Sequence, residues 1–183
     1  MKYIDKSAKI IESDIGDFST IGESTKIFYS KIGKFCSISW NVTVGATNHT
    51  IETISTHNFP FTTFWELSDE YNIKRIKTII GNDVWLGVNV VVIAGIKIGD
   101  GVIIGANSVV TKDLEDYGVY AGNPAKLIKK RFPEETIKIL KEIKWWNFDK
   151  DFIKKNIDFF KKEKILKDDL LRLKELNEKF SYI

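Results

Sequence analysis

Cysteine, histidine, methionine and proline are all scarce in this chain of 183 residues. The single cysteine, Cys36, cannot form an internal disulfide, and no CxxC metal or redox motif is possible. The longest apolar run, Val90 to Ile96, is too short to span a bilayer, and the residues after Met1 contain no apolar signal core. We therefore expect a protein of the reducing cytoplasm without a membrane partner.

An excess of charge of one sign is also missing. The chain has 28 Lys and Arg against 25 Asp and Glu, and a net charge of +3 gives no reason to expect binding to nucleic acid. With 43% hydrophobic residues it can bury a sizeable core, which excludes intrinsic disorder. Residues 126–183 hold 17 basic and 11 acidic side chains, whereas residues 1–125 hold 11 and 14. This change predicts two segments of one domain that meet at Gly122–Ala125.

What the chain does have is a six-residue period. Aliphatic residues recur at steps of six at Ile80, Leu86, Val92, Ile98, Ile104 and Val110. Three positions after each stands a residue that tolerates positive φ or closes a turn: Asp83, Asn89, Gly95, Gly101, Asn107 and Asp113. Four positions after each is a second inward residue: Val84, Val90, Ile96, Val102, Ser108 and Leu114. This repeat predicts short strands stacked into a parallel β-solenoid.

The N-terminal part repeats the theme less strictly, at Ile4, Ile10, Ile15, Ile21, Ile27, Ile32, Ile38 and Val44. Cys36 falls on an inward position, where we interpret it as a small buried hydrophobe rather than a catalytic thiol. The period is lost over about residues 47–76, which are rich in aromatic residues and contain both histidines. We expect this segment to be a loop ejected from the solenoid, and its aromatic content argues against disorder.

After Pro133 the period becomes helical. Ile137, Leu140 and Ile143 form one apolar stripe that leads to Trp145 and Trp146, and a second stripe consists of Leu166, Leu170 and Leu173. We expect this C-terminal helical extension, residues 126–183, to pack on the open end of the solenoid or on a neighbouring subunit.

Both histidines, His49 and His57, lie in the interruption of the solenoid. From the residues alone each is either an inert surface side chain or a base, because imidazole can accept a proton near neutral pH. In the same way, Lys126, Lys129, Lys130 and Arg131 are either a solvated charge run or an anion site.

Several segments then carry a family resemblance over roughly residues 15–150: IGKFCSI (32–38), NH (48–49), STHNFPF (55–61), IGNDVWLG (80–87), IGANSVVTKD (104–113), GNPAKLIKKRF (122–132) and WW (145–146). They resemble the hexapeptide-repeat acetyltransferases, in the branch of the type B chloramphenicol and streptogramin enzymes and related sugar O-acetyltransferases. The resemblance implies a mainly β fold, a left-handed parallel β-helix over residues 1–125 with the ejected loop and a helical tail. It also implies a homotrimer with active sites between subunits and acetyl-CoA in the groove.

The resemblance assigns His49 as the catalytic base that takes the proton of a substrate hydroxyl in a direct transfer, without an acyl-enzyme. The positions that match the acetyl-CoA site of the family, or that could line it, are Val88, Ala106, Thr111, Lys112, Pro124, Lys126 and Lys129. For the acceptor we expect contacts from Asn48, His57, Phe59, Phe61 and Trp85, although Trp85 and Pro124 could equally be packing residues. No metal is expected.

Several functions remain open at this stage. The first is O-acetylation of a sugar or surface glycan, favoured because the long N-terminal elaboration of the antibiotic-modifying relatives is absent. The alternatives are O-acetylation of an antibiotic of the chloramphenicol or streptogramin type and N-acetylation of a nucleotide-linked amino sugar. A non-catalytic solenoid scaffold is the alternative from another class. A zinc site of the carbonic anhydrase type resembles three histidines around the metal, whereas this chain has only two.

Overall fold

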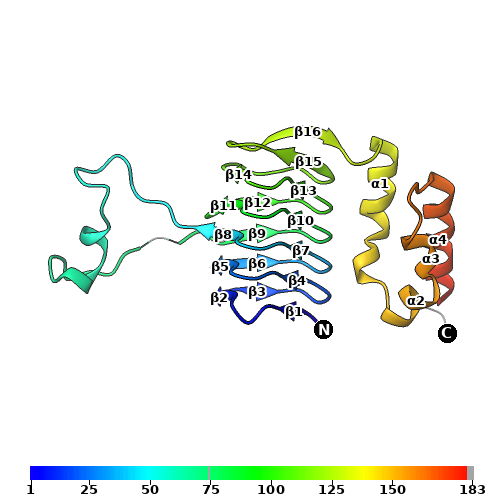
Figure 1. Cartoon of the computed structure of the whole chain (residues 1–183), viewed down its shortest axis with the longest axis horizontal. Coiled ribbons are helices and arrows are strands. Elements are labelled where there is room, and N and C mark those ends of the chain that lie inside the picture. The colour runs from blue at the N-terminus through cyan, green and yellow to red at the C-terminus, as the bar shows by residue number, and fades with distance from the viewer. Residues whose placement is uncertain (74, 181–183) are drawn as a thin grey trace. The chain divides into compact units, whose positions relative to one another are not determined.

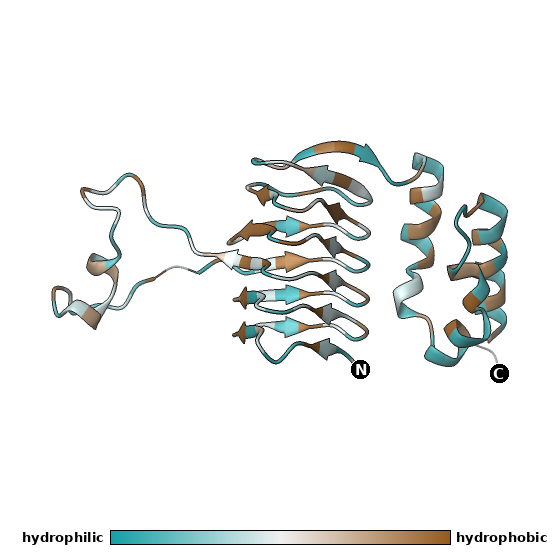
Figure 2. Cartoon of the chain, in the orientation of Figure 1, coloured by the Kyte–Doolittle hydropathy of each residue, from teal (hydrophilic) through white to brown (hydrophobic). Residues whose placement is uncertain are grey.

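The computed structural model describes residues 1–73 and 75–180, which form two compact units. The first is Met1–Lys129 and the second begins at Lys130. Among the described residues no helix combines the length and the apolar character needed to cross a membrane. The elements and the hydropathy of their residues are shown in Figures 1 and 2.

The first unit is the expected parallel β-helix, built from three sheets (Figure 1). The seven-stranded sheet contains β1 (Tyr3–Ile4), β4 (Thr20–Ile21), β7 (Ser37–Ile38), β10 (Trp85–Leu86), β13 (Ile103–Ile104), β15 (Gly118–Ala121) and β16 (Lys126–Lys130). The five-stranded sheet contains β2 (Lys9–Ile11), β5 (Lys26–Phe28), β8 (Thr43–Ala46), β11 (Val91–Ile93) and β14 (Val109–Val110). The four-stranded sheet contains β3 (Asp14–Ile15), β6 (Ser30–Ile32), β9 (Thr78–Ile80) and β12 (Lys97–Ile98).

One circuit through the three sheets is called a coil here, and its length explains the two styles of repeat. Leu86 pairs with Ile104, which is 18 positions later, whereas Ile4 pairs with Ile21 after only 17. The shorter N-terminal coils contain two steps of five residues, from Ile10 to Ile15 and from Ile27 to Ile32. The strands β1 to β15 pair in parallel with the equivalent strands of neighbouring coils, so the aliphatic residues stack in columns.

The predicted inward positions form the core. The six aliphatic positions from Ile80 to Val110 are at most 2% exposed, and the second inward series from Val84 to Leu114 is at most 7% exposed. Ser108 belongs to that series and is fully buried. Its hydroxyl is satisfied there, because it donates to the Gly105 carbonyl and accepts from the Gly122 N–H. Ile4 departs from the expectation and is exposed, since β1 is the outermost strand of its sheet.

The turns between strands use left-handed backbone. Of the six predicted turn residues, five have positive φ: Asp83, Asn89, Gly95, Gly101 and Asn107. Asp113 works differently, because its carboxylate accepts the Lys97 N–H at 2.8 Å. In the N-terminal coils large residues such as Phe18, Tyr29 and Phe35 take the left-handed positions, at a conformational cost of about 1–2 kcal/mol each. Because these residues are not typical turn formers, the turn positions of the N-terminal coils are harder to recognise in the sequence.

Side-chain hydroxyls link successive coils. Ser13, Ser19 and Thr25 each accept a hydrogen bond from the backbone N–H found 17 positions later, on Ser30, Cys36 and Val42 respectively. These hydroxyls satisfy backbone donors at the bends, where the strand ladders are interrupted. The first unit is therefore held together by backbone ladders on the faces and by side-chain bonds at the corners.

The second unit is helical, with α1 (Glu134–Ile143), η3 (Trp145–Asn147), α2 (Lys150–Lys155), α3 (Ile157–Phe160) and α4 (Lys167–Phe180). In Figure 2 α1 and α4 carry both hydrophobic and hydrophilic residues along their length. The helices α1 and α4 pack on each other, and Ile137, Leu140, Ile143, Leu170 and Leu173 are buried. The predicted stripe is wrong at Leu166, which precedes α4 and is 59% exposed.

Candidate active site

The ejected loop leaves the β-helix between β8 and β9 (Figure 1). Ile38 pairs with Leu86, which is 48 positions later, in place of the usual 17 or 18. The coil therefore continues across the insertion without a change of register. The loop contains two short helices, η1 (Phe59–Phe61) and η2 (Thr63–Trp65), and its described residues add no strand to any sheet. The described part of the loop therefore takes no part in the sheets, and its side chains can have a role other than packing in the core.

His49 lies three residues after β8 and is exposed. Its Nδ1 atom is 2.6 Å from the Thr56 carbonyl oxygen, in the part of the loop that turns back. A carbonyl can only accept, so Nδ1 carries the proton and donates it. In the neutral imidazole the Nε2 atom then has a free lone pair. His49 is held in the tautomer that can accept a proton at Nε2.

His57 is held in the opposite tautomer. Its Nδ1 atom accepts the Phe59 N–H at 3.1 Å, so in the neutral ring Nε2 carries the proton and is a donor. The imidazole stacks on Phe59 with the ring centroids 6.0 Å apart and meets Trp65 edge-on at 5.6 Å. Asn48 is exposed beside His49, and Phe61 is half-buried in η1. The loop thus presents one imidazole acceptor and, separately, an imidazole donor among aromatic rings.

Five of the seven positions expected to bind acetyl-CoA fall on two corners of the β-helix, and the other two, Lys126 and Lys129, lie on β16. Between the seven-stranded and five-stranded sheets, Val88 accepts the Asn107 N–H at 2.9 Å, so Val88 lies one coil away from Ala106. Val109 lies in the same coil as Ala106, and its N–H donates to the carbonyl of Gly122 in the following coil. Gly122 precedes the exposed Pro124 by two residues. Val88, Ala106 and Pro124 therefore line one corner over successive coils.

Thr111 and Lys112 follow β14 and are exposed on the next corner, between the five-stranded and four-stranded sheets. The loop leaves from that same corner, because β8, β11 and β14 are neighbours in one sheet and the loop follows β8. Lys126 and Lys129 are exposed on β16, and Trp85 is 53% exposed on β10. The five-stranded sheet is thus flanked by the two corners on which five of the expected donor-binding residues lie.

Cys36 is buried, as expected, at 1% exposure. Its thiol lies 3.2 Å from the Gly81 carbonyl oxygen, and burial raises its pKa to about 11. A thiol with a raised pKa is a poor nucleophile, so Cys36 does not belong to the candidate site. Within residues 1–73 and 75–180, no three or more His, Cys, Asp or Glu side chains are grouped so as to hold a metal ion.

Comparison with known proteins gives a consistent result. Residues 77–112 match the family described as bacterial transferase hexapeptide (six repeats). A probable macrolide acetyltransferase of Lysinibacillus sphaericus is 42% identical over 159 residues, which cover 82% of this chain and 83% of the relative. A chloramphenicol acetyltransferase of Klebsiella aerogenes is 44% identical over 132 residues, covering 67% of this chain and 61% of the relative. The solved maltose O-acetyltransferase from Clostridium difficile 630 aligns with a TM-score of 0.52 and 26% identity, over 73% of this chain and 68% of that one.

The chain belongs to the hexapeptide-repeat acetyltransferases, a family of acyl-transferring enzymes. The family resemblance read from the sequence is therefore confirmed, and so is the β-helix fold. The match spans less than two thirds of the chloramphenicol relative, although it spans most of the macrolide relative.

Sequence reasoning did not single out the residues that hold the loop. Arg75 bonds to Glu12, 63 positions away, and Thr56 contributes only a backbone carbonyl. No local sequence pattern marks Arg75 or Thr56. A salt bridge between distant surface residues leaves no period in the sequence, and any residue can supply a backbone carbonyl.

Proposed function

We propose that this chain is an acetyl-CoA-dependent O-acetyltransferase in which His49 is the general base. The observation that carries the proposal is the 2.6 Å contact between His49 Nδ1 and the Thr56 carbonyl, because it leaves Nε2 as a proton acceptor. His57 has the opposite tautomer and cannot take this role while neutral. Its Nε2–H suits a donor to an oxygen of the acceptor.

In the proposed reaction an acceptor hydroxyl donates a hydrogen bond to His49 Nε2. The hydroxyl oxygen attacks the thioester carbonyl of acetyl-CoA as its proton moves to Nε2, and backbone N–H groups stabilise the oxyanion. The tetrahedral intermediate collapses, the C–S bond breaks, and the imidazolium returns the proton to the leaving CoA sulfur. The ester and the free thiol are the products, and no acyl-enzyme forms.

For acetyl-CoA, the two corners that flank the five-stranded sheet supply the expected contacts. Val88, Ala106 and Pro124 offer an exposed or half-buried line along one corner. Lys112, Lys126 and Lys129 are exposed cations that suit the phosphates of CoA. Thr111 adds a hydroxyl beside Lys112. We propose these residues as the donor site.

A homotrimer with sites between its subunits is part of the proposal. The outward residues of the five-stranded sheet include the apolar, half-buried Val91, Ile93 and Val109. These three residues lie on β11 and β14, whereas the N-terminal strands β2 and β5 of the same sheet present Lys9 and Lys26 outward. The apolar part of this face favours burial against another copy. The loop also exposes large apolar side chains: Ile51, Ile54, Phe64, Trp65 and Leu67.

For the acceptor, we propose a hydroxyl on an antibiotic with a large apolar scaffold rather than a free sugar. Two relatives named for macrolide and chloramphenicol acetylation match this chain over 82% and 67% of its length. The half-buried ring of Phe59 and the exposed ring of Trp65, which both contact His57, offer apolar area for such a scaffold. A sugar hydroxyl is the second candidate, favoured by the likeness to a solved maltose O-acetyltransferase.

The test uses purified protein, acetyl-CoA and a panel of acceptors: chloramphenicol, a macrolide, a streptogramin, maltose and a nucleotide-linked amino sugar. Thiol release identifies the acceptor. We then expect His49→Ala to lower kcat on the order of 10²–10⁴-fold, the usual contribution of a general base, with unchanged affinity for acetyl-CoA. His57→Gln serves as the matched loop control and should lower kcat less. Full turnover of a hydroxyl acceptor by His49→Ala would refute the base.

A further inference from the structure

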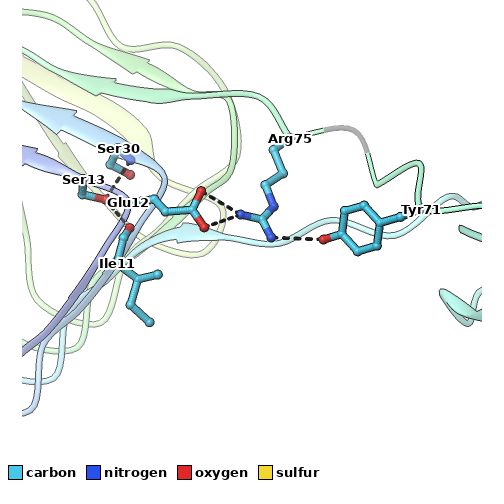
Figure 3. Close-up of polar contacts among 6 residues, drawn as sticks. All are labelled: Ile11, Glu12, Ser13, Ser30, Tyr71 and Arg75. Atoms are coloured by element: carbon cyan, nitrogen blue, oxygen red, sulfur yellow. Dashed lines mark hydrogen bonds and ion pairs between the residues drawn. The ribbon is translucent and has the colours of Figure 1, made fainter. Parts of the chain in front are cut away.

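The part of the loop that returns to the β-helix, residues 71–73 and 75–77, is called the returning arm here. An ion pair between Arg75 and Glu12 fastens it to the β-helix (Figure 3). Arg75 Nη1 lies 2.8 Å and 2.9 Å from the two carboxylate oxygens of Glu12. The other guanidinium nitrogen, Nη2, lies 3.3 Å from the Tyr71 hydroxyl oxygen. Arg75 therefore joins the solenoid on one side to the loop on the other. A planar guanidinium between two partners fixes direction as well as distance.

Glu12 is held on the β-helix with little freedom. It occupies the bend between β2 and β3 with φ of 48°, on the same corner from which the loop leaves two coils further along. The neighbouring Ser13 hydroxyl donates to the Ile11 carbonyl at 2.8 Å and accepts the Ser30 N–H of the next coil at 2.9 Å. Figure 3 shows these contacts beside Glu12, on the side away from Arg75. The anchor of the ion pair is thus part of the rigid stack.

From Arg75 a series of short contacts leads to His49. Next to Tyr71, the Asn72 N–H donates to the Phe61 carbonyl at 3.0 Å, which ties the returning arm to η1. Within that part of the loop the Phe59 N–H donates to His57 at 3.1 Å. Thr56, the residue before His57, accepts the Nδ1–H of His49. The position of the imidazole thus depends on the arm that Arg75 holds.

We propose that Arg75 is a positioning residue for the acetyl transfer, which sets the place of His49 by clamping the loop to Glu12. The inference rests on the proposed role of His49 as the base. The contacts of Arg75 are to Glu12 and Tyr71, so the role assigned to it acts through the loop. Loss of the clamp lets the loop sample positions in which Nε2 is out of reach of the acceptor hydroxyl, and displacements of about 1 Å at a reacting group can cost on the order of 100-fold in rate.

The chain contains a matched control. Lys77 Nζ lies 3.2 Å from Asp14 Oδ2, so this pair links the same two segments. Lys77 directly precedes β9, whose strand ladder already fixes its backbone. Breaking the Lys77–Asp14 pair therefore removes an exposed ion pair of similar kind without releasing the loop.

The experiment measures kcat, KM and the affinity for acetyl-CoA in the full-length protein. We expect Arg75→Ala to lower kcat on the order of 10–100-fold, while acetyl-CoA affinity and the melting temperature stay at the wild-type values. Glu12→Gln should behave in the same way. The charge-swapped double variant, Glu12→Arg with Arg75→Glu, should recover most of kcat. Lys77→Met and Asp14→Asn should leave kcat unchanged.

Two outcomes overturn the inference. One is wild-type kcat in Arg75→Ala, and the other is a swap that restores nothing although the double variant melts normally. His49→Ala in the same assay separates this from failure of the proposed function. If His49→Ala is fully active, the base assignment fails. If His49→Ala is inactive and Arg75→Ala is fully active, only the clamp is refuted.

Discussion

The two histidines of the loop differ in which ring nitrogen carries the proton, and that difference decides their chemistry. Each ring has its Nδ1 atom bound to the backbone, but His49 donates to a carbonyl whereas His57 accepts from an N–H. Backbone partners cannot exchange these roles, so the tautomers are set by the path of the chain. Two residues of one type, eight positions apart, are thereby suited to opposite tasks.

Cys36 shows the converse, a reactive side chain made inert by its surroundings. Desolvation by burial is the main cause of its pKa of about 11, against an ordinary value of 9.0. The folded protein thus keeps the thiol proton at pH values where the unfolded chain loses it. The stability from this group is fully present below pH 9 and is lost as the pH rises toward 11.

We predict that Ellman's reagent does not react with the native thiol at pH 8 and reacts fully in guanidinium. Between pH 9 and 11 the melting temperature should fall more steeply in the wild type than in Cys36→Ala, because only the wild type has a buried thiol to ionise. Rapid labelling of the native protein, or equal pH slopes for the two proteins, would contradict this account.

At the scale of the element, the corners set how closely the coils approach. A Cβ atom on Gly16 would lie 2.5 Å from the carbonyl carbon of Gly33, which is backbone of the next coil and cannot move aside. On Gly105 the nearest atom would instead be the Ala121 Cβ at 3.2 Å. The two glycines therefore differ in how much their lack of a side chain matters.

We predict that Gly16→Ala lowers the free energy of unfolding by about 1–3 kcal/mol, the usual cost of overpacking, because two coils must separate. Gly105→Ala is the control and should cost less than about 1 kcal/mol. Urea unfolding followed by circular dichroism measures both. Equal losses in the two variants would show that the coil spacing is not limiting at Gly16.

The described residues of the loop take no part in the strand pairing of the solenoid. The strands β8 and β9 keep their partners in the adjacent coils, and the described residues 47–73 and 75–77 add no strand to the sheets. The strand pairing of the first unit therefore does not depend on the described residues of the loop.

We predict that replacing residues 47–76 by a short glycine-rich linker leaves the β-sheet signal intact and shifts the melting temperature by only about 5 °C or less. Acetyl transfer should be abolished, since His49 is removed. Circular dichroism and thiol release give the two readouts. An unfolded variant would mean that the loop stabilises the stack.

At the scale of the whole molecule, the predicted site needs residues from two regions. The candidate base lies on the loop, whereas the expected donor residues lie on the solenoid and on β16. A ring of copies in which each loop serves its neighbour would unite them, and closed cyclic symmetry is the usual way to complete such contacts.

We predict a particle of about 63 kDa in sedimentation, from three chains of 21.0 kDa each. Mixed trimers of His49→Ala and Lys126→Glu should regain about a quarter of the wild-type activity, since one interface in four then pairs an intact base with an intact donor site. The two variants should be nearly inactive alone after the same treatment. A mixture no more active than its components would place both groups in one subunit.

The six-residue period by itself determined the β-helix, its core and the place of the interruption. Whether a residue such as Val92 or Ile104 points inward depends only on its place within its own repeat, so a local pattern is enough to predict it. A local pattern also predicted the apolar stripes of the helices. It did not predict where α4 begins, because Leu166 was assigned to the stripe but precedes the helix. The interpretation of His49 as a base came from family resemblance and remains a prediction.

Only the tertiary structure decided which atoms of the loop are free to react. The tautomers of His49 and His57 depend on backbone groups brought close by the loop's own folding, and the Arg75–Glu12 pair joins residues 63 positions apart. The left-handed Phe18 and Phe35 likewise follow from stacking, since the neighbouring coils impose a bend that these residues do not prefer. Such contacts between distant residues obey no period, so only the folded chain reveals them.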